Sequence, residues 1–431
     1  MGIKAINKSD WMELAVYILI FTIPFQAFNL KITFVTISLT NIFLLFLTPF
    51  YFVKFIFDKK ILADLNKKRL LILLIILILS SIVSSIAARD FSSSLRNVVT
   101  IIGNSLLIFI VVLSVNNLRT LANCYKIIIA TSLLLCIITI LMGMNLIPNY
   151  FEEQGIIHRS MFPRTFFGLS IPYTRNTGFI TTQGTWGVWV MPSLSLVVAS
   201  VFMKNLRQIF FKEEYLSLSY FLILTMAVLI TQSRMVWLGY FITITSFVIL
   251  YWFLKFHKYL FISLLCWLVC LMVLAMNKIV QGITFVANEG IENVYDRLHG
   301  YSYALKLILT SLLLGVGKNV FSQTYHSDTG AKFVHNVFLQ ITLLQGLVGL
   351  ICFILIICLA TFSLLKTLRA TTNSFTKNLS IVITSSWISI LAIVMFYPAL
   401  SDKGLWSTLG LIFSLQCIEE NKVNKKITTF V

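Results

Sequence analysis

Residues 70–88 read LLILLIILILSSIVSSIAA, and this stretch decides the class of fold. It contains no charged residue, and its apolar side chains would cover every face of a helix. A helix crosses the roughly 30 Å hydrocarbon core of a bilayer with about 20 apolar residues, whereas a buried strand is much shorter. The stretch therefore predicts a transmembrane helix.

The composition extends this prediction to the whole chain. Of the 431 residues, 58% are hydrophobic and 12% are charged, whereas about a quarter of the residues in soluble domains are charged. This excludes a soluble enzyme, a disordered tail and a collagen-like fibre. We predict an all-α, polytopic integral membrane protein in which residues 1–431 form a single membrane domain. The twelve predicted spans are 11–29, 32–53, 70–88, 97–115, 126–147, 179–203, 215–232, 235–254, 259–276, 336–365, 379–400 and 404–418.

The distribution of basic residues predicts the orientation. An even number of spans places both termini on one side, and 21 of the 34 Lys and Arg residues fall on that side. Six of them lie in residues 54–69. The positive-inside rule therefore predicts cytoplasmic termini. Because these basic residues are dispersed among short loops, the net charge of +18 does not predict a nucleic-acid partner.

The predicted external side has a different basic composition. It carries seven Arg and six Lys, whereas the cytoplasmic side carries four Arg and 17 Lys. Arg presents a planar fork that pairs with phosphate oxygens, so the bias favours an external site for a phosphorylated ligand. Chance is the alternative, because eleven arginines are few. Two external loops are long enough to form such a site, residues 148–178 and residues 277–335.

The second external loop contains a predicted helix over residues 297–314, which ends at Gly315-Val-Gly317. At helical spacing, one face carries Arg297, Tyr301, Ala304, Leu305 and Ile308. Arg297 would lie at the N-terminus, where backbone amides also attract anions. The alternative is an interfacial Arg in contact with water.

His335-Asn336 precedes the long apolar span that contains Gly346-Leu-Val-Gly349. An imidazole that is neutral at pH 7 is suited to accept a proton, although His at a membrane boundary is commonly just an interfacial residue. Gly346 and Gly349 predict close helix packing.

Three further arginines are candidates. Arg234 lies in the turn Thr231-Gln-Ser-Arg234-Met-Val-Trp237, which joins two spans with almost no loop. Arg234 is therefore predicted to lie at or below the external membrane surface. Ionisable groups inside a membrane are costly and functional by default. The alternative is that the side chain snorkels up to the surface. Arg175 precedes the sixth span and is a weaker candidate of the same kind, and Arg164 lies in the same loop.

Several catalytic motifs are absent from the sequence. There is no DxD motif to hold a divalent metal against a nucleotide sugar, no phosphate-binding P-loop, no dinucleotide fingerprint and no nucleophile elbow. We therefore expect no metal and no cofactor, and a donor that carries its own activation.

The pattern Arg297…Gly315-Val-Gly317…His335-Asn336-Val-Phe-Leu-Gln…Gly346-Leu-Val-Gly349-Leu350 resembles the shared core of the O-antigen ligase and O-antigen polymerase superfamily. Ser233-Arg234-Met-Val-Trp237 resembles the motif that precedes this core. The resemblance covers roughly residues 228–352. Each motif is weak alone, whereas their order and spacing together are fairly specific.

The resemblance implies a metal-independent, inverting membrane glycosyltransferase of the GT-C type. It would use an undecaprenyl-diphosphate-linked glycan as donor at the periplasmic face of the bacterial inner membrane. Arg234 and Arg297 would bind the donor diphosphate, and His335 would activate or orient the acceptor hydroxyl. Arg175, Asn336, Tyr301 and Arg164 are the predicted substrate-binding residues, and the loop over residues 277–335 would carry the catalytic elements on short helices.

The sequence departs from the family pattern at two places. Ligases of this family often read His-x-His-Asn, whereas here the residues are Phe333-Val334-His335-Asn336. Tyr301 and Tyr303 stand where relatives often have Trp. The first departure favours a polymerase, which would extend a lipid-linked glycan, with membrane lipids and a chain-length regulator as further partners. A ligase with lipid A–core as acceptor is the alternative, and a transporter or flippase for an anionic solute is the third hypothesis.

Overall fold

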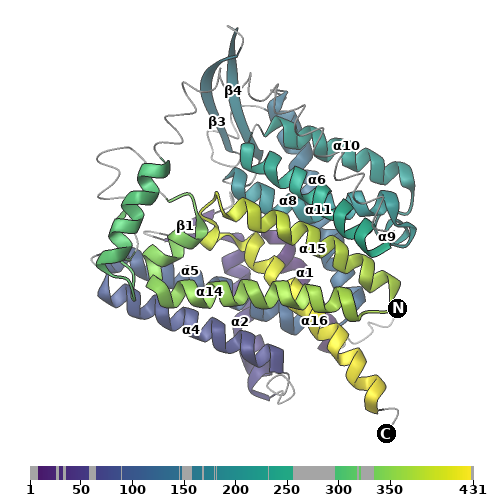
Figure 1. The fold of residues 1–431 in the computed structure, drawn as a ribbon, viewed down its shortest axis with the longest axis horizontal. Helices are drawn as coiled ribbons and strands as arrows, with labels where there is room; N and C mark the ends of the chain where they lie inside the picture. Colours follow the sequence, from purple (N-terminus) through teal and green to yellow (C-terminus); the bar gives the residue numbers. More distant parts are fainter. Residues whose placement is uncertain are drawn as a thin grey trace.

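The computed structural model describes residues 8–25, 29–32, 35–57, 65–88, 90–144, 146–147, 158–166, 169–178, 180, 182–231, 233–255, 297–317, 320–321 and 334–428. This part of the chain is a bundle of helices with two β-hairpins (Figure 1). The helices are α1 (Lys8–Thr22), α2 (Leu39–Phe57), α4 (Leu65–Ala87), α5 (Phe91–Ser114), α6 (Leu118–Gly143), α8 (Gln183–Phe202), α9 (Lys204–Phe210), α10 (Glu214–Ile230), α11 (Arg234–Lys255), a helix over residues 297–310, α14 (Val337–Ala370), α15 (Ser374–Val394), the 3-10 turn η1 (Ala399–Ser401) and α16 (Lys403–Thr428). The strands are β1 (Asn29–Ile32), β2 (Val35–Ser38), β3 (His158–Phe166) and β4 (Leu169–Gly178).

The helical membrane fold is confirmed. Within the described residues, seven helices are long and apolar enough to cross a membrane, and eight are if α9 and α10, which meet at 80°, form one broken span. Eleven of the twelve predicted spans overlap a described helix. The predicted span 259–276 lies outside the described residues, so the number twelve remains a prediction.

The two hairpins show that the all-α prediction is wrong in two segments. The first two predicted spans are separated by the antiparallel pair β1–β2, because α1 ends at Thr22 and α2 begins at Leu39. In the loop 148–178, β3 and β4 pair from His158 opposite Gly178 to Phe166 opposite Leu169. Both segments mix polar with β-branched or aromatic residues, a composition that suits a paired strand better than a membrane helix.

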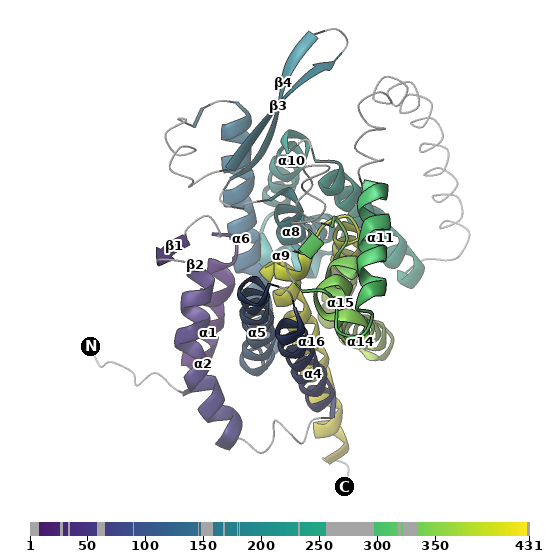
Figure 2. The same ribbon diagram turned by 90° about the vertical axis from the view of Figure 1, so that its left-hand side faces the viewer.

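The centre of the bundle is built on α8 and α16, which the other helices surround (Figure 2). Within its apolar window, 89% of α8 is buried, compared with 39% of α4. Polar side chains join α8 to α6: the Trp186 indole donates to Thr139 at 3.2 Å, and the Trp189 indole donates to Thr131 at 3.1 Å. Hydrogen bonds of this kind stabilise helix pairs where apolar burial alone gives little preference for one partner.

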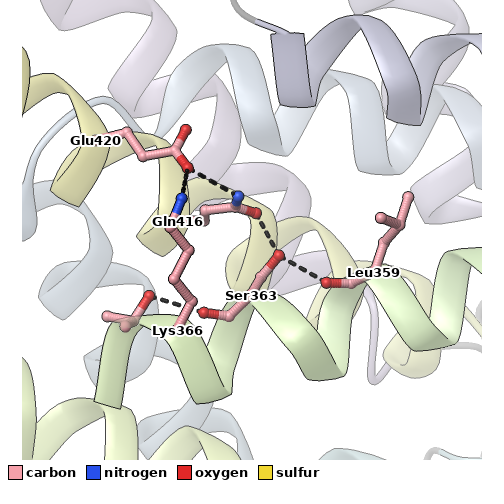
Figure 3. Close-up of polar contacts among 6 residues, drawn as sticks. Leu359, Ser363, Lys366, Gln416 and Glu420 are labelled. Carbon is pink, nitrogen blue, oxygen red and sulfur yellow. Dashed lines mark hydrogen bonds and ion pairs between the residues drawn. The ribbon is translucent and has the colours of Figure 1, made fainter. Parts of the chain in front are cut away.

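A polar network joins α14 to α16 near the ends of both helices (Figure 3). Lys366 and Glu420 form an ion pair at 2.9 Å, and Glu420 also accepts a hydrogen bond from Gln416 at 3.1 Å. The other amide atom of Gln416 bonds the Ser363 hydroxyl. Each polar group therefore has a partner on the facing helix or one turn away.

The bundle has two ends, which we name by the direction of α14. The end where α14 begins, at Asn336, is called the site end, and the end where α14 finishes, at Ala370, is called the opposite end. At the site end, Asn336 donates to the Met395 carbonyl at 3.0 Å and so joins the start of α14 to the end of α15. Figure 1 places residues 297–310 and β1 at the left, and α9 with the end of α14 at the right.

Candidate functional site

The helix over residues 297–310 packs against the start of α14. Ala304 and Ile308 are buried in a small apolar cluster that includes Leu343 of α14, and Tyr301 packs against the same cluster. The predicted helical face is confirmed for these three residues. Leu305, which the helical spacing places on the same face, is outside this cluster, and its side chain is 52% exposed.

Arg297, Tyr301 and His335 lie together at the site end. The Tyr301 hydroxyl donates to the His335 backbone carbonyl at 2.8 Å, although the two residues are 34 positions apart. Burial lowers the pKa of His335 below its usual 6.5, and the Arg297 guanidinium lowers it further. Burial raises the pKa of Tyr301, and Arg297 opposes this rise. His335 is therefore neutral at pH 7, beside a fixed positive charge.

The arginine of this group is available to a ligand. The Arg297 side chain is exposed, and it makes no ion pair with any carboxylate in the described part of the chain. It is the first residue of its helix that the structure describes. The half-buried neutral imidazole of His335 can accept a proton. The neighbouring exposed guanidinium of Arg297 can hold a phosphate.

Asn336 acts as the N-cap of α14. Its amide oxygen accepts from the backbone N–H of Phe338 at 2.9 Å and of Leu339 at 3.0 Å. Together with the bond to Met395, these contacts hold the segment that carries His335. The structure thus gives Asn336 a positioning role, and its predicted contact with substrate remains a prediction.

The glycines of the Gly315-Val-Gly317 motif dock onto a break in α14. Gly315, Gly317 and Gly346 all have positive φ angles, of 76°, 82° and 66°. Gly346 interrupts the helix and so frees the Leu343 carbonyl, which accepts from the N–H of Val316 at 2.8 Å and of Gly317 at 3.3 Å. The motif therefore does more than end a helix, because it replaces hydrogen bonds that α14 has lost.

Close packing also explains why positions 346 and 349 of the motif Gln345-Gly346-Leu-Val-Gly349 are glycines. A Cβ on Gly346 would lie 2.1 Å from the Leu313 carbonyl oxygen, and a Cβ on Gly349 would lie 2.4 Å from Cβ of Gln345. Gln345 is buried and accepts a hydrogen bond from Ser80 of α4 at 3.0 Å. Sequence reasoning missed Gln345, although a lone amide in an apolar span is a usable signal.

Arg234 starts α11, and its side chain is exposed. The turn is held by the Trp237 indole, which donates to the Val228 carbonyl at 2.9 Å. Further along α11, the Gly239 carbonyl accepts from Ser389 of α15 at 2.6 Å. Because the end of α15 also contacts Asn336, Arg234 and His335 flank the same helix end.

Arg164 and Arg175 lie on the β3–β4 hairpin, for which the structure describes the backbone. Arg175 pairs with Ser160, and Arg164 pairs with Ile171 nearer the tip. Four residues of strand separate these levels, which corresponds to about 13 Å. The base of β4 contacts α6 and α8, so Arg175 is the nearer of the two to the bundle. The structure does not bring Arg164 and Arg175 to one level.

A buried polar cluster at the site end was not predicted. Asp402 caps α16 through a 2.8 Å bond from the Gly404 N–H, and burial raises the pKa of this carboxyl to about 6. The Tyr397 hydroxyl lies 2.7 Å from the hydroxyls of both Thr182 and Thr185. Burial, together with the Asp402 charge, raises the pKa of Tyr397 to about 12. The signal was Asp402-Lys403, a charged pair at the start of a predicted span.

The described residues contain no group of three or more His, Cys, Asp and Glu side chains arranged to hold a metal ion.

Comparison with known proteins agrees with the geometry. The family model described as O-antigen ligase matches residues 219–354, which run from α10 into α14 and include Arg234, Arg297 and His335. No curated protein matches the chain. The match covers less than half of the chain, and it supports the resemblance of this segment to the O-antigen ligase and O-antigen polymerase superfamily.

Proposed function

We propose that the protein is an O-antigen or related surface-polysaccharide polymerase, which transfers a glycan from undecaprenyl diphosphate to the terminal sugar of a lipid-linked repeat unit. The observation that carries the proposal is the neutral His335 beside the exposed Arg297 within the family segment. The absence of a second His two residues before His335 favours polymerase over ligase.

The proposed reaction inverts the anomeric carbon in one displacement. The acceptor hydroxyl oxygen attacks the anomeric carbon, and the bond from this carbon to the diphosphate oxygen breaks. Undecaprenyl diphosphate leaves with the electron pair, and the hydroxyl proton passes to His335. Arg297 and Arg234 stabilise the charge that develops on the diphosphate, as fixed donors next to a low-dielectric phase do well.

The membrane setting supplies the rest of the proposal. Both termini would be cytoplasmic in the bacterial inner membrane, so that the site end faces the periplasm. The external loops 148–178 and 277–335 would then flank the site. No nucleotide sugar is available in that compartment, and a lipid diphosphate provides the leaving group without a metal.

The α14 break bears on the transporter hypothesis. Discontinuous spans are common in transporters, where the free backbone groups bind the solute. Here the freed Leu343 carbonyl is occupied by Val316 and Gly317 of the same chain, and the break carries no charged side chain. The break therefore supports a structural role and favours the transferase.

A gene deletion analysed on lipopolysaccharide gels tests the proposal. Loss of a polymerase leaves core bearing a single repeat unit, whereas loss of a ligase leaves bare core and stranded lipid-linked chains. Complementation with the wild type should restore the ladder, and complementation with His335→Gln should not. Bare core in the deletion strain would favour the ligase over the polymerase. A full ladder in the deletion strain would contradict both proposals.

A further inference from the structure

A cavity lies at the opposite end of the bundle, far from His335. It has a volume of about 330 Å³, and its walls come from α6, α9 and α15. Its lining is Leu118, Arg119, Ala122, Asn123, Lys126, Ile209 and Phe375. The lining combines two cations with apolar side chains and contains no carboxylate.

The two cations share one face of α6. Arg119, Asn123 and Lys126 follow each other at spacings of four and three, which places them in one row. Arg119 and Lys126 are exposed, and neither makes an ion pair with a described residue. The carboxylate on neighbouring α1, Glu13, accepts hydrogen bonds from Tyr17 at 3.4 Å and Asn117 at 3.3 Å. The positive charge in the cavity is thus not neutralised by the walls.

The depth of this row matches the headgroup layer of a bilayer. The apolar span in α6 covers Leu118–Gly143, 26 residues, which corresponds to about 39 Å of helix. The hydrocarbon core is only about 30 Å thick, and residues 127–144 contain no charged residue, so we place the remaining roughly 9 Å of α6 outside the core at its charged N-terminal end. Arg119 is at the projecting tip, and Lys126 is about 10 Å deeper, where its long side chain reaches back to the interface.

The α9 helix forms a wall of the cavity in the manner of an interfacial helix. It meets α10 at 80°, buries Leu206 and exposes Lys204. Its Ile209 lines the cavity opposite the cations of α6. A ligand that fits these walls carries a phosphate close to an apolar acyl chain.

We propose that this cavity binds the headgroup of an anionic phospholipid from the adjacent membrane leaflet. Arg119 and Lys126 bind the phosphodiester, and Ile209 and Phe375 contact the glycerol and the first methylenes. Basic pockets between spans are a known means of binding acidic lipids. The proposal is independent of the transferase chemistry, because the cavity and His335 lie at opposite ends of the bundle.

Native mass spectrometry of the full chain with added phosphatidylglycerol or phosphatidylcholine tests the proposal. Each basic residue near an anionic lipid contributes about fivefold in affinity, so Arg119→Gln/Lys126→Gln should bind phosphatidylglycerol about 30-fold more weakly. The matched control is Arg69→Gln/Arg369→Gln, which removes two exposed charges at the same end and should bind like the wild type.

The double variant Arg119→Lys/Lys126→Arg keeps both positive charges and should retain binding. It therefore separates loss of charge from loss of folding. Unchanged preference for phosphatidylglycerol in the Gln double variant would overturn the proposal. An equal loss of affinity in the control double variant would also overturn the proposal, because the loss would then come from the general surface charge. Complete displacement of the lipid by millimolar inorganic phosphate would identify a free-anion site instead.

Discussion

Two arginines of the site, Arg234 and Arg297, lie on helices that are held in different ways. The helix α11, which begins at Arg234, is a membrane span that packs along α8 and α15. The helix over residues 297–310 is held by a small apolar cluster, the Tyr301 hydrogen bond and the glycine interlock with α14. One arginine is thus placed by the bundle and the other by a few local contacts, and the second should be the more sensitive to substitution nearby.

The largest effect should come from the arginines themselves. A Lys at position 297 or 234 keeps the charge and loses the planar fork that binds two phosphate oxygens. We expect each of Arg297→Lys and Arg234→Lys to lower transfer from a lipid diphosphate donor about 100-fold or more. The control is Arg96→Lys on α5, at an exposed position outside the site, which should keep its activity. Near-normal transfer by both site variants would contradict the proposed diphosphate site.

Replacing the glycine at the α14 break should destabilise the protein more than replacing a glycine in α11. Gly346→Ala forces a side chain into a positive φ and onto the Leu313 carbonyl, and we expect the free energy of unfolding to fall by about 3 kcal/mol. In α11, Gly239→Ala meets the mobile end of Ile393 at 2.6 Å, so about 1 kcal/mol is expected. Thermal unfolding in detergent measures both.

Gly103→Ala is the reference for these substitutions, because nothing lies within 4 Å of the added Cβ. It should be neutral or raise stability by about 0.5 kcal/mol. Equal melting temperatures for Gly346→Ala and Gly103→Ala would show that the interlock does not stabilise the protein.

The pH profile should report the pairing of Arg297 with His335. Because the pKa of His335 is lowered below 6.5, the imidazole is neutral at pH 7 and gains a proton only as the pH falls further. We expect the acid limb of kcat/KM to lie below pH 6.5, and Arg297→Gln to move the limb of its residual activity upward, since the guanidinium charge is gone. A limb above pH 6.5 in the wild type would be inconsistent with this environment.

The smallest effect should come from the Tyr301 hydroxyl. Tyr301→Phe keeps the ring in its cluster and removes the 2.8 Å bond to the His335 carbonyl, which corresponds to about 1 kcal/mol or a five- to tenfold loss of transfer. Tyr215→Phe, an exposed position at the start of α10, is the control. An identical activity of Tyr301→Phe and wild type would show that this bond does not position His335.

Much of the membrane architecture could be predicted from the sequence. Hydropathy alone located eleven of the described helices, because a bilayer requires long apolar segments whatever the rest of the chain does. The order of Arg234, Arg297 and His335 along the chain also predicted the resemblance that the family model finds over residues 219–354. The hairpin β3–β4 was missed, because strand pairing depends on a partner and not on the period of one segment.

Two features were decided only by the tertiary structure. Gly315-Val-Gly317 has the composition of a helix end, and only the contact with Leu343 shows that it completes a broken span. The cluster around Asp402 and Tyr397 is assembled from two distant segments, residues 182–185 and 397–404, and no local pattern encodes such a meeting. Hydropathy and residue type are local and can be read from the sequence, whereas the juxtaposition of Arg297 and the half-buried His335 exists only after the chain packs.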